Sequence, residues 1–400
     1  MKTLLTGGRV YSYPGYETKD ILTEDGNILD IGDDIRAEAE KVILCDNFFL
    51  IPGLIDVHVH FREPGAEYKE TILTGSGAAA AGGYTTVCPM PNLYPTPYDM
   101  EGLSVELAAI EKDAAVRVLP YGRITDGKKV ADLEALAPHV CAFSDDGSGV
   151  QGEGLMREAM ERAKALGRLI VAHCEDTRFA PEDPRSEWSE IERDIRLADE
   201  TGCSFHVCHV SAKESVELIR DAKKSGVDIT CETAPHYLIF SNEALPDEGR
   251  FKMNPPIRMK DDKAALIRGV QDGTIDMIAT DHAPHSAEEK SRGFAGSLNG
   301  ILGLESAFPV MYTALVEGGI IGMDRLIELM SGAPAERFGL PGGKIETGRA
   351  ADIAVVDLTD TFTIDPSGWR SKGRSTPFEG MRVKGRIMKT IMEGQTVYER

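Results

Sequence analysis

The middle of the chain alternates between short apolar segments and amphipathic segments. This pattern predicts parallel strands joined by helices, because each strand must be followed by a crossover before the next parallel strand can form. The expected helices include residues 70–81, 154–166, 190–200 and 213–224. The expected strands are residues 54–60, 84–88, 116–120, 141–143, 169–173, 204–209, 228–233 and 277–280.

Closure of these strands into a barrel fits their number, so the expected fold class is α/β with a (β/α)8 TIM-like barrel. An open, doubly wound sheet is the alternative.

Both ends of the chain read as short strands separated by turn residues. Asp25-Gly26 lies between apolar flanks and predicts a β-hairpin, because this dipeptide suits the tight turn that joins two antiparallel strands. We expect residues 1–52 and 344–400 to meet in one small flanking β-sandwich domain, and residues 53–343 to form the catalytic barrel.

Charge and cysteine content narrow the function classes. The formal net charge of -21 argues against nucleic acid or an anionic membrane as a partner. It does not argue against a small anionic substrate, because a bound metal ion can reverse the local field. The 7 cysteines lack any framework spacing and indicate reduced, buried thiols. With neither a signal peptide nor a membrane span evident, we expect a cytoplasmic enzyme.

The first barrel strand ends in His58-Val59-His60. Side chains at positions i and i+2 of a strand lie on the same face, so both imidazoles can reach one metal ion. We expect Val57 and Val59 to pack outward against helices. The end of a barrel strand is also where the active sites of such barrels lie.

Three later strands end in the same way, with His173, His209 and Asp281. For any one of them, a hydrogen-bonded core histidine or a helix-capping aspartate is the better interpretation. When all three residues lie at the same rim of one barrel, however, a shared metal site is the better interpretation. Imidazole and carboxylate ligands suit zinc or a similar divalent ion. A bridging ligand between two ions could come from Asp145 or Asp146, although Asp-Asp-Gly is also ordinary turn chemistry.

At these residues the sequence resembles the amidohydrolase superfamily and, within it, the dihydroorotases of the longer bacterial type. The resemblance covers essentially the whole chain. It rests on the motifs GLIDVHVHFREPG at 53–65, CPMPN at 88–92, VAHCED at 171–176, HVCHVS at 206–211, KMNPP at 252–256 and ATDHAPH at 279–285.

The resemblance implies two divalent ions, with zinc as the first candidate. His58, His60 and Asp281 would hold one ion, and His173 and His209 the other. Many relatives bridge the ions with a carboxylated lysine, which the segment 141–144 does not offer. Relatives with an aspartate in that role point to Asp146 as the bridge.

The resemblance also implies the substrate contacts. A metal-bridged hydroxide would attack the amide carbonyl, with Asp281 as general acid and base. His60 would line the substrate site beside its ion. Arg62, Asn92 and His285 would bind the substrate carboxylate. Asn254 and the backbone at Asn299 and Gly300 would meet the ring amides.

The activity that follows is the reversible cyclisation of N-carbamoyl-L-aspartate to (S)-dihydroorotate with release of water, the third step of de novo pyrimidine synthesis. The first alternative is a related cyclic amidase, such as a hydantoinase or an allantoinase. The second is a catalytically silent homologue that acts as a partner of a transcarbamoylase. Relatives suggest a homodimer or an association with aspartate transcarbamoylase.

Overall fold

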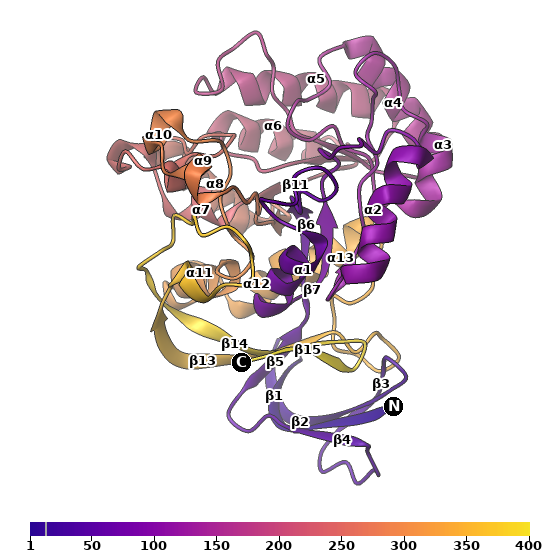
Figure 1. Cartoon of the computed structure of the whole chain (residues 1–400), viewed down its shortest axis with the longest axis vertical. Helices are drawn as coiled ribbons and strands as arrows, with labels where there is room; N and C mark the ends of the chain where they lie inside the picture. The colour runs from indigo at the N-terminus through magenta and orange to yellow at the C-terminus, as the bar shows by residue number, and fades with distance from the viewer. Residues whose placement is uncertain (13) are drawn as a thin grey trace.

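A barrel built from the middle of the chain lies above a β-sheet that contains both chain ends (Figure 1). The structure is a computed structural model, and it describes residues 1–12 and 14–400. Neighbouring barrel strands are parallel. These strands are β6 (Leu54–Val59), β7 (Tyr84–Pro89), β8 (Arg117–Val118), β9 (Ile170–Ala172), β10 (Phe205–Val207), β11 (Ile229–Thr233) and β12 (Met277–Ile278).

The barrel closes through isolated bridges between its two runs of strands. Phe143 pairs in parallel with Gly122 and with Ile170, so it joins the β6-β7-β8 run to the run from β9 to β12. Val59 pairs in parallel with His282 and completes the ring. The barrel prediction is therefore confirmed. The expected strand at 141–143 is reduced to the ladder position of Phe143, and the expected strand at 116–120 is shortened to β8.

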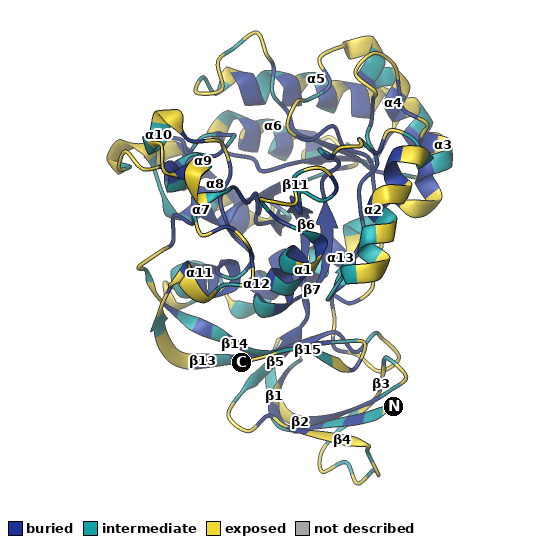
Figure 2. Ribbon diagram, in the orientation of Figure 1, coloured by how far each residue is buried: buried dark blue, intermediate teal, exposed yellow. Residues whose placement is uncertain are grey.

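Helices surround the barrel and turn their apolar faces toward it, which leaves their outer faces exposed (Figure 2). Helix α1 starts where the Thr71 side chain accepts a hydrogen bond from the Thr74 N–H, and Glu63 accepts from the Ile72 N–H. The helices are α1 (Ile72–Ala81), α2 (Met100–Asp113), α3 (Leu133–Leu136), α4 (Glu153–Ala165), α5 (Arg185–Thr201), α6 (Lys213–Lys224), α7 (Pro235–Ile239), α8 (Lys260–Asp272), α9 (Ala287–Lys290), α10 (Gly293–Gly296), α11 (Ala307–Met311), α12 (Met323–Ile327) and α13 (Ala333–Phe338).

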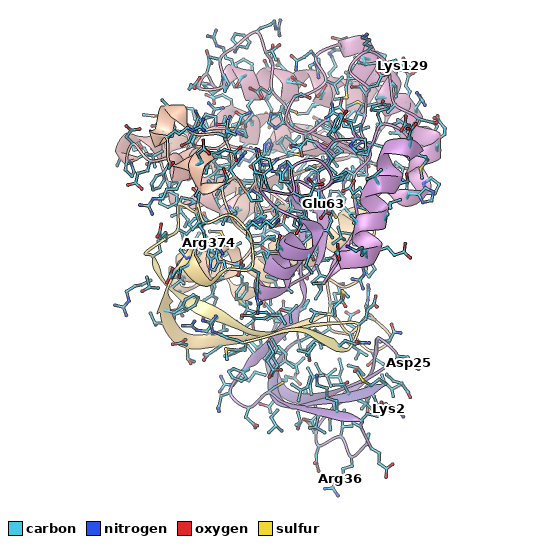
Figure 3. All side chains as sticks on the ribbon, in the orientation of Figure 1. Lys2, Asp25, Arg36, Glu63, Lys129 and Arg374 are labelled. Atoms are coloured by element: carbon cyan, nitrogen blue, oxygen red, sulfur yellow. The ribbon has the colours of Figure 1, made fainter. Side chains whose placement is uncertain are left out.

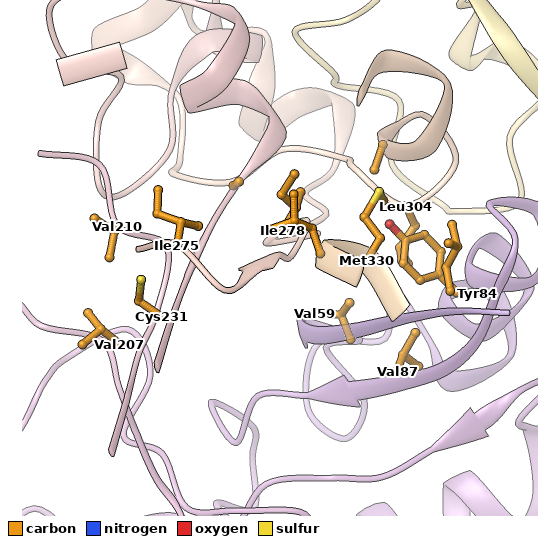
Figure 4. Close-up of a cluster of buried hydrophobic side chains, with 14 of the residues drawn as sticks. Val59, Tyr84, Val87, Val207, Val210, Cys231, Ile275, Ile278, Leu304 and Met330 are labelled. Carbon is orange, nitrogen blue, oxygen red and sulfur yellow. The ribbon is translucent and has the colours of Figure 1, made fainter. Parts of the chain in front are cut away.

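The main core lies between the barrel strands and these helices (Figure 4). Val59 belongs to this core, together with Ile72 of α1, and so faces outward as expected. Val57 does not face outward as expected. It belongs to a separate apolar cluster with Tyr121, whose hydroxyl donates to the Val57 carbonyl. The pairing of β6 with β7 shifts register between Asp56 and Val59, which breaks the alternation that the prediction assumed.

The chain ends form one sheet in the order β15-β14-β13-β5-β1-β2-β3, with β4 paired to β1. Its inward side chains, among them Leu5, Ile21 and Val355, share one apolar cluster. The Asp25-Gly26 hairpin is confirmed, because these residues join β2 to β3 with positive φ angles of 48° and 86°. The strands are β1 (Lys2–Ser12), β2 (Gly15–Glu24), β3 (Asn27–Gly32), β4 (Lys41–Leu44), β5 (Phe49–Pro52), β13 (Ile353–Thr363), β14 (Arg382–Met392) and β15 (Gln395–Glu399).

The first residues of the chain are anchored to this sheet. The amino group of Met1 donates to Asp25 over 2.8 Å, and Lys2 pairs with Glu24. Figure 3 labels Lys2 and Asp25 at this end of the molecule and Arg374 on a loop that returns from the sheet to the barrel. Within the described ranges, no helix has the length and apolar character needed to cross a membrane.

Candidate active site

Metal-competent side chains from several barrel strands converge inside the barrel. Each lies at or just beyond the carboxyl end of its strand, and each is buried. The structure thereby brings together all of the ligands expected from the sequence, which are His58, His60, Asp146, His173, His209 and Asp281.

His58 and His60 turn the same kind of atom toward the centre. The Nε2 atoms of His58 and His60 lie 3.6 and 3.1 Å from Oδ1 of Asp281. Their other ring nitrogens are engaged: Nδ1 of His58 lies 2.6 Å from Glu232, and Nδ1 of His60 lies 3.0 Å from the Asn92 side-chain oxygen. An oxygen that only accepts fixes the proton on Nδ1, which leaves Nε2 with a lone pair for a metal ion.

His173 and His209 form a second group. Nδ1 of His173 lies 2.9 Å from Nε2 of His209, and both nitrogens lie 3.6 Å from Oδ1 of Asp146. Nε2 of His173 donates to Glu175 over 2.9 Å, so the lone pair on Nδ1 faces the centre. As in His58, one ring nitrogen of His173 contacts a carboxylate and the other faces the centre.

The two neighbouring aspartates have different environments. Asp146 lies between the two groups of histidines, with Oδ1 3.3 Å from Nε2 of His58 and Oδ2 3.5 Å from Nε2 of His60. Asp145 points elsewhere, accepts hydrogen bonds from the backbone of Ile124 and Thr125, and pairs with Arg123. Only Asp146 is therefore placed to bridge the two groups.

The unpaired atoms at the centre fit metal ions. Among the described residues, Nε2 of His58 and Oδ1 of Asp146 are buried side-chain atoms without a hydrogen-bond partner. Such orphaned buried atoms are rare, because each loses its water without compensation. A cation between a nitrogen lone pair and a carboxylate oxygen would satisfy both. The groups that could hold an ion are His58 with His60 and Asp281, Asp146 with His173 and His209, and His58 with Asp146 and Cys208.

The electrostatics favour charged carboxylates and a neutral His60. Burial alone would raise the pKa of Asp146, but His58, His173 and His209 hold it well below its usual range. Burial lowers the pKa of His60. Burial raises the pKa of the Cys208 thiol, so this group stays protonated and is the weaker candidate ligand.

The backbone at the site is strained. Arg62, His209 and Asp281 have positive φ angles of 60°, 32° and 49°, a region that residues other than glycine seldom adopt. Each of these residues follows the end of a barrel strand. Strain of this kind persists only where the surrounding structure imposes it, and it is common where side chains must be aimed at a site.

Arg62 and Asn92 lie beside the metal-competent groups, as expected. The Arg62 Nε donates to the Pro284 carbonyl over 3.3 Å, and burial lowers the pKa of Arg62. Within residues 1–12 and 14–400, its Nη atoms have no hydrogen-bond partner, so they can meet a carboxylate. The side-chain oxygen of Asn92 contacts His60, which leaves its amide N–H groups for a ligand.

The remaining expected substrate contacts are partly engaged within the protein. The side chain of Asn254 donates to Glu175 over 2.8 Å. Nε2 of His285 lies 2.7 Å from the Asn299 carbonyl, and the Gly300 N–H donates to the Lys252 carbonyl. A carbonyl oxygen has two lone pairs, so that of Asn299 can still accept from a ring amide.

The sequence analysis missed two groups that orient the histidines. Glu232 on β11 contacts His58 and, at 3.3 Å, Nε2 of His206. Although its burial opposes ionisation, His58 and His206 lower the pKa of Glu232 to about 2. Glu175 orients His173. The signal for Glu232 was a carboxylate within the expected barrel strand at 228–233, since a carboxylate inside a barrel needs a partner.

Comparisons with known proteins agree with this geometry. The amidohydrolase family matches residues 49–397. A dihydroorotase from Listeria innocua is 47% identical over 99% of this chain and 98% of its own length. A dihydroorotase from Bacillus cereus is 44% identical over 100% of this chain and 99% of its own length.

A solved structure of similar fold is the L-hydantoinase (dihydropyrimidinase) from Arthrobacter aurescens. Its TM-score is 0.90 at 28% sequence identity, and the match covers 99% of this chain and 96% of that one. The shared fold is a barrel with a flanking β-sandwich, which confirms the expected fold class. The identity is clearly higher to the dihydroorotases than to this hydantoinase.

Proposed function

The chain belongs to the amidohydrolase family, and we propose that its activity is that of a dihydroorotase. This reaction interconverts N-carbamoyl-L-aspartate and (S)-dihydroorotate by closing or opening a cyclic amide, as the third step of pyrimidine synthesis. The observation that carries the proposal is the part-buried guanidinium of Arg62 beside the metal-competent centre. The full-length similarity to dihydroorotases supports the same activity.

We assign two divalent ions to the centre, with zinc as the first candidate. His58, His60 and Asp281 would hold one ion, His173 and His209 the other, and Asp146 would bridge them. Nitrogen and carboxylate donors of this kind suit zinc. When bound, the ions would supply a water activated near neutral pH and would polarise the amide carbonyl.

Asp281 is the residue proposed to move the proton. Its carboxylate lies against His60, and although burial opposes ionisation, His60 and His58 lower the pKa of Asp281 below its usual range. An ionised carboxylate can accept the proton of the attacking water and return it to the departing amide nitrogen. In the direction of ring closure the same oxygen works in reverse.

Arg62 and Asn92 are proposed to orient the substrate through its carboxylate. The planar guanidinium can donate two parallel hydrogen bonds to a carboxylate, and the Asn92 amide can add another. Asn254 lies beside Glu175, where it can approach the ring together with the Asn299 carbonyl. These contacts fix which amide bond of the ring faces Asp281.

A related cyclic amidase is the second candidate, because the L-hydantoinase shares the fold. The test offers the purified protein dihydroorotate, hydantoin and allantoin, with metal content measured in parallel. We expect turnover of dihydroorotate and little of the other two. Hydrolysis of hydantoin without dihydroorotate would refute the proposal. Inactivity on all three with metal bound would favour a silent partner of a transcarbamoylase.

We infer a cytoplasmic enzyme that works on a small anionic substrate as a homodimer or with aspartate transcarbamoylase. We also infer that the division at residues 52/53 and 343/344 separates the sheet of the chain ends from the catalytic barrel. Size-exclusion chromatography, alone and with purified transcarbamoylase, tests the assembly.

A further inference from the structure

The strained backbone of His209 is followed by two residues that are held from different sides. The Val210 N–H donates to the Glu232 carbonyl of β11 over 2.8 Å. The Ser211 N–H donates over 3.0 Å to a carboxylate oxygen of Glu187, which belongs to α5. Because a residue other than glycine keeps a φ of 32° only where its surroundings impose it, these contacts explain the conformation of His209.

Glu187 also takes the place of a capping residue for α6, which lies beside α5 (Figure 1). The residue before α6 is Ala212, whose side chain cannot accept a hydrogen bond. Glu187 accepts from the Ala212 N–H over 3.0 Å, from the Ser215 hydroxyl over 2.7 Å, and from the Ser211 hydroxyl. A carboxylate at a helix N-terminus satisfies unpaired N–H groups and is favoured by the helix dipole. One carboxylate therefore fixes the whole turn between His209 and α6.

A buried arginine holds this carboxylate in place. Arg258, in the segment that leads into α8, is 7% exposed, and its Nη2 lies 3.8 Å from Glu187. Its Nε donates to the Ser211 hydroxyl over 3.2 Å. Its Nη1 donates to the carbonyls of Pro181 and Glu182, each over 2.9 Å. Because a buried charge needs a partner of opposite charge, the pair links the loop before α5, the turn before α6 and the segment before α8.

We propose that Glu187 is a positioning residue for the metal centre, which imposes the backbone conformation of His209 and so aims its imidazole, with Arg258 as its counter-charge. The inference rests on the two ions of the proposed function and deepens it, because it concerns the ion assigned to His173 and His209. Nε2 of His209 lies 2.9 Å from Nδ1 of His173, so a small rotation of the backbone at His209 would separate these two atoms.

The two ions should depend on Glu187 to different degrees. His58 lies on β6, and its ring is oriented by Glu232. The turn that Glu187 fixes begins at His209, which is assigned to the other ion. A change at Glu187 should therefore weaken one ion and spare the other, whereas a general loss of stability would weaken both.

Competition between the zinc-loaded protein and a chelator tests the proposal without any measurement of turnover. Glu187→Gln should weaken one of the two zinc equivalents by roughly 10–100-fold, the range expected for a group that orients a metal ligand, and leave the other near its wild-type affinity. The amide keeps the shape of the side chain but leaves the Arg258 charge unpaired. In crystals of the variant, the anomalous peak beside His209 should be the weaker of the two.

Two further variants test whether the ion pair acts as a unit. Arg258→Met should weaken the same zinc equivalent, and the double variant should lose no more affinity than the weaker of the two single variants. If Glu187→Gln does not fold, Glu187→Asp replaces it, because the shorter side chain keeps the charge but not the reach. Glu192→Gln is the matched control on the exposed face of α5, and it should leave both zinc equivalents unchanged.

Unchanged affinity for both zinc equivalents in Glu187→Gln would overturn the inference, and so would equal weakening of both. Additive losses in the double variant would overturn the role given to Arg258. A wild-type protein that shows the two zinc equivalents but leaves dihydroorotate unchanged would refute the proposed function alone, because the metal measurement does not depend on the substrate.

Discussion

Nδ1 of His58 lies 2.6 Å from Oε1 of Glu232, and neither side chain is more than 1% exposed. The carboxylate holds the imidazole so that Nε2 faces Asp146. Because both side chains are buried away from water, solvent screens their hydrogen bond little. This hydrogen bond fixes both the tautomer and the orientation of the His58 ring.

Glu232→Gln should therefore weaken metal binding by roughly 10–100-fold, since the amide keeps the shape but loses the charge. Competition with a chelator measures the affinity directly. Glu217→Gln, on the exposed face of α6, is the control. Unchanged metal affinity in Glu232→Gln would show that the contact does not support the site.

Asp281→Asn should lower kcat by about 10²–10⁴, because the amide can still approach an ion but cannot take up the proton. Steady-state kinetics with dihydroorotate, on protein of known metal content, checks this. A variant with full metal and wild-type kcat would remove Asp281 from proton transfer.

Arg62→Met should raise the KM for dihydroorotate by roughly 10–100-fold and leave metal content unchanged. In the proposed function the guanidinium would meet the substrate carboxylate through its Nη atoms, and Arg62 is not among the groups that could hold a metal ion. Metal analysis and kinetics on the same preparation separate the two effects. If metal were lost together with activity, Arg62 would be a structural residue.

The carboxyl group of Glu305 predicts a pH effect on the stability of the fold. Its carboxylate accepts from the Arg370 and Ser371 N–H groups, and burial raises its pKa to about 7. An unfolded glutamate titrates near pH ~4.3. The folded chain thus holds a proton that the unfolded chain has lost, and this stabilisation disappears as pH rises toward 7.

The thermal midpoint measured from pH 5 to pH 8 tests this against Glu305→Gln. The wild type should lose stability relative to the variant as pH rises across that range. A constant difference between the two proteins would contradict the assignment.

Much of the candidate site was predictable because a polar residue follows directly after the short apolar segment of several barrel strands. His173 and Asp281 are of this kind, and all such ends meet at one rim. The sequence could not distinguish Asp145 from Asp146, because adjacent residues of one turn have the same chemistry. The tertiary contacts of the two aspartates decide which one can bridge the metal-competent groups, because Asp145 is paired with Arg123 instead.

Two features depended on tertiary contacts that no local pattern encodes. Val57 packs in the separate cluster with Tyr121 because the pairing of β6 with β7 shifts register next to it. The proton of His285 is placed by the Asn299 carbonyl and by Lys69, which come from separate loops. The resemblance implied that His285 binds the substrate carboxylate, and only the contacts indicate that its Nε2 donates to the Asn299 carbonyl.

The most direct test of the account is a crystal structure of the active protein with anomalous scattering at the metal edge. We predict two peaks, one within reach of His58, His60 and Asp281 and one within reach of His173 and His209, with Asp146 between them. A fully active preparation with a single peak, or with no metal among these side chains, would contradict the dinuclear centre.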